Sequence, residues 1–139
     1  MAIDDFANAL ENLNDDDAKF QAYFQKGICL RRLGDLKNSI QDLLNATKLK
    51  EKSAAAHNNL GLSYFESGDY NDAIDHYGKA LKQVDGVTSV HYNNRGLAYY
   101  HDGKLEEALN DFNKAIQIDD SDPTIYFNRG NAYLNSVPD

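Results

Sequence analysis

Two columns of glycine, each repeating at an interval of about 34 residues, constrain this sequence more than any other feature. Members of the first column are separated by 34, 35 and 34 residues and are Gly27, Gly61, Gly96 and Gly130. The second column comprises Gly34, Gly68 and Gly103. Self-similarity at such a period is typical of solenoid proteins, in which each structural unit packs only on its neighbours.

The best-formed unit, residues 53–83, shows four further columns that keep the same register. Tyr64 recurs as Leu30, Tyr99 and Tyr133; Ala73 as Ser39 and Ala108; Tyr77 as Leu43 and Phe112; Ala80 as Ala46 and Ala115. A glycine inside a helix costs roughly 0.5–1 kcal/mol relative to Ala, so its fourfold recurrence implies a steric need. We expect the Gly and Ala columns to let helices approach closely and the large residues to fill the remaining space.

The spacing H-x2-LG-x2-Y-x8-A-x3-Y-x2-A, from His57 to Ala80, closely resembles the tetratricopeptide repeat, a helix-turn-helix unit. The resemblance covers residues 20–135 and implies an all-α fold, a right-handed α-solenoid of antiparallel helix pairs. The large residue that opens each unit is Tyr23, His57, Tyr92 or Tyr126, never Trp. We interpret His57 as a structural histidine in this core-facing position.

The repeat register divides the chain into an N-terminal helix, three complete units and part of a fourth. The expected boundaries are 1–17 for a half repeat or cap, 20–53, 54–88 and 89–122 for complete repeats, and 123–139 for the first helix of an incomplete one. The predicted helices span 2–13, 18–33, 36–49, 54–67, 70–83, 89–102, 105–118 and 123–135. The first of them contains DDFANAL, which resembles NDFNKAI at 110–116, the second helix of a repeat.

Local signals support these helix boundaries. The Asp15–Asp17 run, Ser53 and Asp69 are predicted N-caps, because a short polar side chain can accept from the free N–H groups of a first turn. Pro123 suits the first helical position, where its missing N–H costs nothing. Gly34 is expected in the left-handed conformation that ends many helices.

Composition and motifs exclude several classes of function. The net charge of −8 disfavours nucleic acid and anionic membranes as partners, although residues 18–53 hold eight bases against three acids. No apolar run approaches the roughly 20 residues needed to span a bilayer. The single Cys29 indicates a reducing, cytoplasmic setting. The sequence shows no phosphate loop, nucleophile elbow or metal-binding cluster, so we expect no enzyme, no cofactor and no metal.

The most informative polar feature stands two residues before each glycine of the first column, at Gln25, Asn59, Asn94 and Asn128. In the tetratricopeptide fold this column faces the concave groove. It resembles the asparagine ladder in the repeats of O-linked N-acetylglucosamine transferases, where amides hold the backbone of an extended peptide. An Asn amide offers donors and an acceptor that match one peptide unit. Alternatively, these amides bond to each other or to water along the inner wall.

The sequence therefore predicts a protein-protein interaction module that binds an extended peptide of a partner protein. Its candidate peptide-binding residues are Asn58, Asn59, Leu62, Phe65, Asn93, Asn94, Leu97, Tyr100, Asn128 and Arg31. For Arg31 and its neighbour Arg32 we favour a solvated face over contact with an acidic peptide.

Two further partners were considered. A two-carboxylate clamp for chaperone tails is disfavoured, because its three cationic positions hold Phe24, Val90 and Asn94. The structural alternative concerns the uncapped terminal helix, residues 123–135. We expect this helix either to belong to an excerpt of a longer array, which we favour, or to pack on a second copy and form a homo-oligomer.

Overall fold

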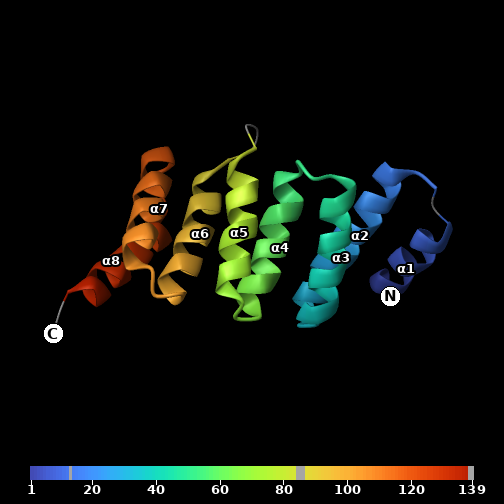
Figure 1. Cartoon of the computed structure of the whole chain (residues 1–139), viewed down its shortest axis with the longest axis horizontal. Coiled ribbons are helices and arrows are strands. Elements are labelled where there is room, and N and C mark those ends of the chain that lie inside the picture. Colours follow the sequence, from blue (N-terminus) through green and yellow to red (C-terminus); the bar gives the residue numbers. More distant parts are fainter. Residues whose placement is uncertain (13, 84–86, 138–139) are drawn as a thin grey trace.

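The computed structural model describes residues 1–12, 14–83 and 87–137, and these residues form helices and short connections (Figure 1). The eight helices within these ranges are α1 (Ala2–Asn12), α2 (Asp16–Arg32), α3 (Leu36–Leu49), α4 (Ala54–Glu66), α5 (Tyr70–Leu81), α6 (Ser89–His101), α7 (Leu105–Ile118) and α8 (Pro123–Ser136). Each described helix end lies within two residues of its predicted position. Residue 13, the predicted end of the first helix, lies outside the described residues.

The helices form antiparallel pairs that stack into an α-solenoid (Figure 1), as predicted. α2 pairs with α3, α4 with α5 and α6 with α7, and each second helix packs on the first helix of the next unit. The first helices α2, α4, α6 and α8 also contact one another in succession. In the described part of the chain, no such contact joins successive second helices. The first helices therefore line the inner wall of the solenoid, and the second helices form its outer side.

The first glycine column is where the two helices of a unit meet most closely. A Cβ atom added to Gly27 would lie 2.6 Å from Leu43, one added to Gly61 would lie 2.6 Å from Tyr77, and one added to Gly96 would lie 2.7 Å from Phe112. Tyr77, Phe112 and Leu43 are at most 1% exposed. Inside each of these helix pairs, the predicted glycine column of the first helix therefore packs directly against the predicted column of large side chains on the second helix. Gly130 differs, because a Cβ there would meet no atom within 4 Å.

The second glycine column makes the turn inside each pair. Gly34, Gly68 and Gly103 have φ angles of +83°, +84° and +81°. An L-residue with a side chain rarely adopts this left-handed conformation, so glycine is the favoured residue. The N–H of each glycine donates to the carbonyl three residues earlier, at 3.0–3.1 Å, which closes the preceding helix.

Three of the four predicted helix starts behave as expected. The side chains of Asp15 and Ser53 accept hydrogen bonds from Asp17 N and Ala56 N, and Pro123 occupies the first turn of α8. Asp69 stands at the N-cap position of α5 but makes no capping hydrogen bond with its side chain. Its carboxylate instead accepts from the Ser67 hydroxyl at 2.8 Å, so this part of the prediction is wrong.

Beside the glycine contact, two units bury an ion pair. The residue before the glycine is a cation and the residue before the large side chain is an aspartate: Lys26 with Asp42, and Arg95 with Asp111. Arg95 is bidentate, donating to both carboxylate oxygens at 2.7 and 2.8 Å. Lys26 Nζ stands 3.4 Å from Asp42, and burial raises the pKa of that carboxyl despite the nearby lysine.

In the middle unit, Leu60 stands at the position of the cation, and His76 stands at the position of the aspartate and contacts His57. His57 Nε2 lies 2.8 Å from the Glu51 carbonyl oxygen, which can only accept, so this nitrogen carries the proton. His57 Nδ1 lies 3.2 Å from His76 Nδ1, and one of these two nitrogens donates to the other. Both rings are buried, His57 at 6% and His76 at 9% exposed, as expected for a structural histidine at position 57.

Burial, with Lys79 and His57 nearby, lowers the pKa of His76 to about 4. The folded state therefore binds a proton at His76 less readily than the unfolded chain, whose His titrates near 6.5. This contribution to stability is complete above about pH 6.5 and is lost as the pH falls toward 4. We expect the free energy of unfolding to drop by about 2 kcal/mol between pH 7 and pH 4.5 through this group alone. Urea unfolding at both pH values, in the native chain and in His76→Leu, measures it; an equal drop in both chains would contradict it.

Candidate functional site

The inner wall contains a hollow between α4 and α6, with a volume of about 190 Å³. Its lining residues are Leu62, Phe65, Glu66, Tyr77, Asn94 and Leu97. Four of these were candidate peptide-binding residues in the sequence, and the structure brings them together from two units. Tyr77 reaches the hollow from α5, since its ring fills the space left by Gly61. The hollow thus has largely apolar walls and one amide, Asn94.

Asparagine amides connect successive first helices along this wall. Asn94 Nδ2 donates to Asn58 Oδ1 at 3.4 Å, and Asn128 Nδ2 donates to Asn93 Oδ1 at 3.0 Å. These bonds run diagonally, from the residue two before the glycine of one unit to the residue three before the glycine of the preceding unit. In this structure the amides of successive first helices bond to each other. An Asn has two N–H donors and a carbonyl with two lone pairs, so one such bond leaves capacity for a ligand.

Asn59 does not join these pairs. Its Nδ2 donates to the Ala55 carbonyl of its own helix at 2.9 Å. The candidate Tyr100 contacts a residue that the sequence did not single out, because its hydroxyl accepts from Asn135 Nδ2 at 2.6 Å. The wall contacts thus extend from α6 onto the last turn of α8.

Arg31 corrects a sequence interpretation. It does not stand on a solvated face: its Nη1 donates to Glu66 Oε1 at 2.8 Å, and its side chain is 19% exposed. This ion pair joins the ends of α2 and α4 on the inner wall. Arg32, by contrast, is exposed as expected.

Glu66 and Asn135 share a sequence signal that could have identified them. Each lies 35 residues after its partner, Arg31 or Tyr100, and the two amide pairs are separated by 35 and 36 residues. First helices of adjacent units run parallel to each other. A side chain on one first helix therefore faces the residue about 35 positions further along the chain, one more than the usual repeat length of 34. Searching for complementary polar pairs at this spacing would have found all four contacts.

Phe65 and Tyr100 are held by aromatic neighbours at the end of the hollow. The ring of Phe65 makes edge contacts with Tyr70 and His101, with both pairs of ring centroids 5.4 Å apart. Tyr100 contacts His101 edge-on at the same distance. Such aromatic contacts restrict the orientation of the two rings.

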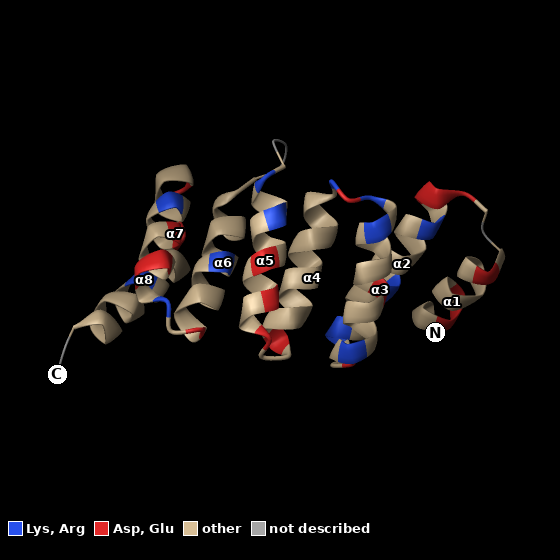
Figure 2. Ribbon diagram, in the orientation of Figure 1, with Lys and Arg blue, Asp and Glu red and all other residues tan. Residues whose placement is uncertain are grey.

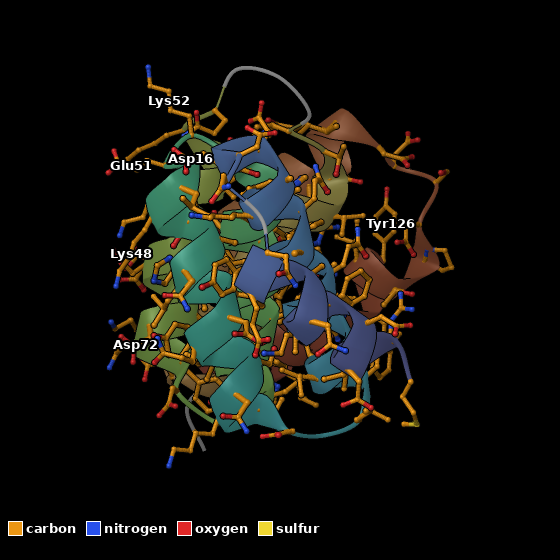
Figure 3. All side chains as sticks on the ribbon, turned by 90° about the vertical axis from the view of Figure 1, so that its right-hand side faces the viewer. Asp16, Lys48, Glu51, Lys52, Asp72 and Tyr126 are labelled. Carbon is orange, nitrogen blue, oxygen red and sulfur yellow. The ribbon has the colours of Figure 1, made fainter. Side chains whose placement is uncertain are left out.

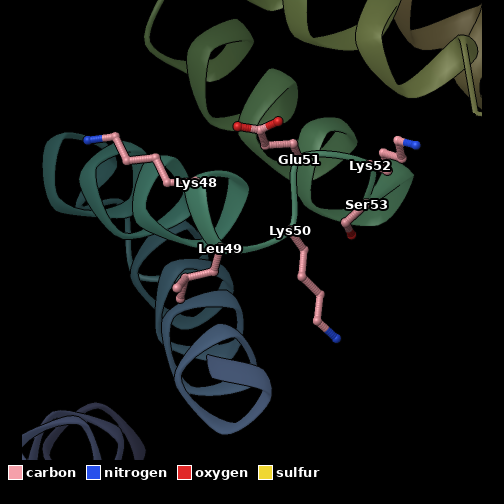
Figure 4. A pocket seen from close by; sticks show the side chains of 6 residues that line it. All are labelled: Lys48, Leu49, Lys50, Glu51, Lys52 and Ser53. Carbon is pink, nitrogen blue, oxygen red and sulfur yellow. The ribbon is translucent and has the colours of Figure 1, made fainter. Parts of the chain in front are cut away.

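A larger hollow, of about 550 Å³, lies at the turn between α3 and α4 but is a poorer candidate. It is lined by the consecutive residues 48–53, whose charged side chains point in different directions (Figure 4). Lys50 is engaged by Asp17 at 3.0 Å and lies over the Phe20 ring. Because no set of polar groups converges there, we assign it no ligand.

The outer side of the solenoid is charged. Figure 3 shows Lys48, Glu51 and Asp72 on the edge opposite Tyr126 of α8. Along the chain, acidic residues occur on α1, and Lys and Arg residues occur on the inner helix α2 and the outer helix α3 (Figure 2). Across the residues described, no His, Cys, Asp and Glu side chains form a group of three that could hold a metal ion. None of the helices described here has the length and hydropathy to cross a membrane.

Comparison with protein families gives the class of the chain. A model described as TPR repeat matches residues 29–68 and 96–136, and one described as tetratricopeptide repeat matches residues 54–83. The chain therefore belongs to the tetratricopeptide repeat family. No curated protein sequence matches it.

Solved structures with the same fold include MamA, which is 24% identical with a TM-score of 0.86 over 96% of this chain and 75% of MamA. YrrB, described as a TPR protein with an unusual peptide-binding site, is 22% identical with a TM-score of 0.79 over 94% of this chain and 65% of YrrB. The first TPR of Spaghetti (RPAP3), bound to the HSP90 peptide SRMEEVD, is 17% identical with a TM-score of 0.79, covering 84% of this chain and 92% of that domain. At these identities the likeness concerns the fold.

Proposed function

We propose that this chain is a non-catalytic interaction module that binds an extended peptide segment of a partner protein along the wall of α2, α4, α6 and α8. The hollow between α4 and α6 carries this proposal, because apolar side chains and the Asn94 amide face the same space there. Members of the family with the same fold bind peptides, as the RPAP3 complexes with HSP90 and HSP70 peptides illustrate.

The proposed binding mode combines one apolar anchor with backbone hydrogen bonds. A peptide side chain enters between Leu62, Phe65 and Leu97, where burial of apolar surface is worth roughly 25 cal/mol per Å². The remaining N–H of Asn94 then donates to a peptide carbonyl, and the side-chain carbonyl oxygen of Asn94 accepts from a peptide N–H. Its bond to Asn58, at 3.4 Å, is long, so Asn94 can turn toward a ligand at small cost.

The ligand's chemistry follows from the charges of the wall. Arg31, a cation on this wall, is already paired with Glu66, and Phe24, Val90 and Asn94 occupy positions where a carboxylate clamp needs cations. An acidic chaperone tail would therefore bury its carboxylates without partners, at a cost of several kcal/mol. We infer a peptide recognised by an apolar side chain and its backbone rather than by a terminal carboxylate.

Titration of a selected peptide tests this mode. Peptides are selected against the chain by phage display, and their dissociation constants are measured by calorimetry. Asn94→Ala removes the backbone contacts, and we expect about tenfold weaker binding, or roughly 1.4 kcal/mol.

The matched control is Asn110→Ala, the same replacement at an exposed position on the second helix α7. It should leave the affinity unchanged. Equal affinities for the native chain and both variants would place the peptide elsewhere on the molecule and reject the proposed mode.

A further inference from the structure

The two end helices of the solenoid, α1 and α8, each expose a face. In every complete unit, the corresponding helix face is covered by the other helix of the pair. On α8, Tyr126, Phe127, Tyr133 and Leu134 are between 42% and 72% exposed. Gly130 is open, whereas its counterparts Gly27, Gly61 and Gly96 are covered by a large residue of a second helix. α8 is therefore a first helix whose second helix is missing from the described chain.

α1 has the complementary property. It packs on α2, as each second helix packs on the following first helix. Its sequence aligns with α7 at four positions that share one helix face: Ala2 with Ala108, Asp5 with Asp111, Phe6 with Phe112 and Ala9 with Ala115. The four residues of α7 are at most 2% exposed, because they pack on α6. In α1, none of the four counterparts is buried.

The ion-pair position provides an independent match. Arg95 lies over the rings of Tyr92 and Tyr99, with its Cζ 5.9 and 5.7 Å from the ring centroids, and binds Asp111. Arg129 repeats this geometry over Tyr126 and Tyr133, at 5.3 and 5.9 Å. The Arg129 guanidinium is therefore held in the same placement in which Arg95, one unit earlier, binds the carboxylate of Asp111. Its Nη1 donates meanwhile to the neutral Asn113 Oδ1 at 3.0 Å.

We propose that α8 of one copy binds α1 of a second copy of this chain, so that the two helices complete a repeat across the junction. In that interface Phe6 of the second copy covers Gly130 as Phe112 covers Gly96. Asp5 of the second copy pairs with Arg129 as Asp111 pairs with Arg95. The inference is independent of peptide binding, since it uses the ends of the solenoid rather than the hollow between α4 and α6.

The contact joins two different surfaces, so it is heterologous. A head-to-tail contact that continues the rotation of a superhelix does not close into a ring and produces open chains of copies. We therefore expect a distribution of oligomers that grows with concentration rather than a single dimer. Continuity of the inner wall through the junction follows, because each new copy adds its first helices to the same side.

Sedimentation of the full chain from about 1 µM to about 1 mM tests the association. The weight-average mass should rise above the 15.6 kDa of one copy as the concentration increases. Asp5→Arg and Arg129→Asp each place like charges in the junction, and each should weaken association at least about tenfold. Circular dichroism verifies that both variants keep the native helical signal.

An equimolar mixture of the two charge variants distinguishes the proposed junction from other modes of association. The arginine introduced at position 5 of one chain can pair with the aspartate introduced at position 129 of the other, and the remaining junction is native. Association should therefore return in the mixture. A constant mass of one copy at all concentrations overturns the proposal. So does association of Asp5→Arg alone at native strength, which would indicate a symmetric contact between α8 helices or non-specific aggregation.

Discussion

Replacing Gly61 by Leu should lower the free energy of unfolding by about 3 kcal/mol, the upper part of the usual range for overpacking a core. A Cβ at this position would already lie 2.6 Å from two ring carbons of Tyr77, which is 1% exposed. The ring cannot move aside without opening the contact between α4 and α5. We expect the melting temperature to fall by about 10 °C or more in a thermal scan followed by circular dichroism.

Gly130→Leu is the matched control, because the same helical column carries no contact there. Measured at a few micromolar, it should unfold at or slightly above the native temperature, since Leu is a better helix former than Gly by up to about 1 kcal/mol. If both variants lost the same stability, close packing at Gly61 would not explain why glycine recurs.

Asp111→Asn should also be strongly destabilising, by about 3 kcal/mol in urea unfolding at neutral pH. Asp111 is 2% exposed and receives two hydrogen bonds from Arg95. The neutral amide keeps the shape of the carboxylate but leaves the guanidinium without its counter-charge. Its NH2 group also faces a donor, and an unsatisfied charged group inside a protein is costly.

Asp42→Asn provides the comparison in the first unit. Lys26 approaches Asp42 only to 3.4 Å, and burial raises the pKa of that carboxyl, so its charge is poorly compensated. Removing this charge should cost less than about 1 kcal/mol. A loss as large as that of Asp111→Asn would show that position in the repeat, rather than the bidentate geometry, determines the energetics.

Repetition in the sequence made the helices and their pairing predictable. A column such as Gly61, Gly96 and Gly27 reports the same local contact three times, which removes the ambiguity of any single helix. Ser39 is an instructive departure from its Ala column. Its hydroxyl donates to the Gly27 carbonyl at 2.7 Å and bonds with Ser63 at 2.8 Å, joining two units inside the core. The column predicted a small residue, while the hydrogen bonds depend on a neighbour in the next unit.

The candidate site was predicted only in outline. The columns placed Leu62, Phe65, Asn94 and Leu97 on one wall, and the structure brings them to one hollow. They did not reveal that Asn94 bonds Asn58, or that Arg31 pairs with Glu66. These contacts depend on the shift between parallel first helices, which is set by packing of whole helices rather than by any local pattern.

The sequence by itself determined the solenoid, because the Gly, Ala and aromatic columns specify which helix faces can pack closely. Only the tertiary structure decided how units face one another along the inner wall, which polar groups are already paired there, and which faces of α1 and α8 stay open. The physical reason is the separation along the chain between the residues whose packing decides each feature. Helix formation and packing within a unit follow residues at most about 34 positions apart, whereas the wall and the ends depend on the angle and offset accumulated between neighbouring units.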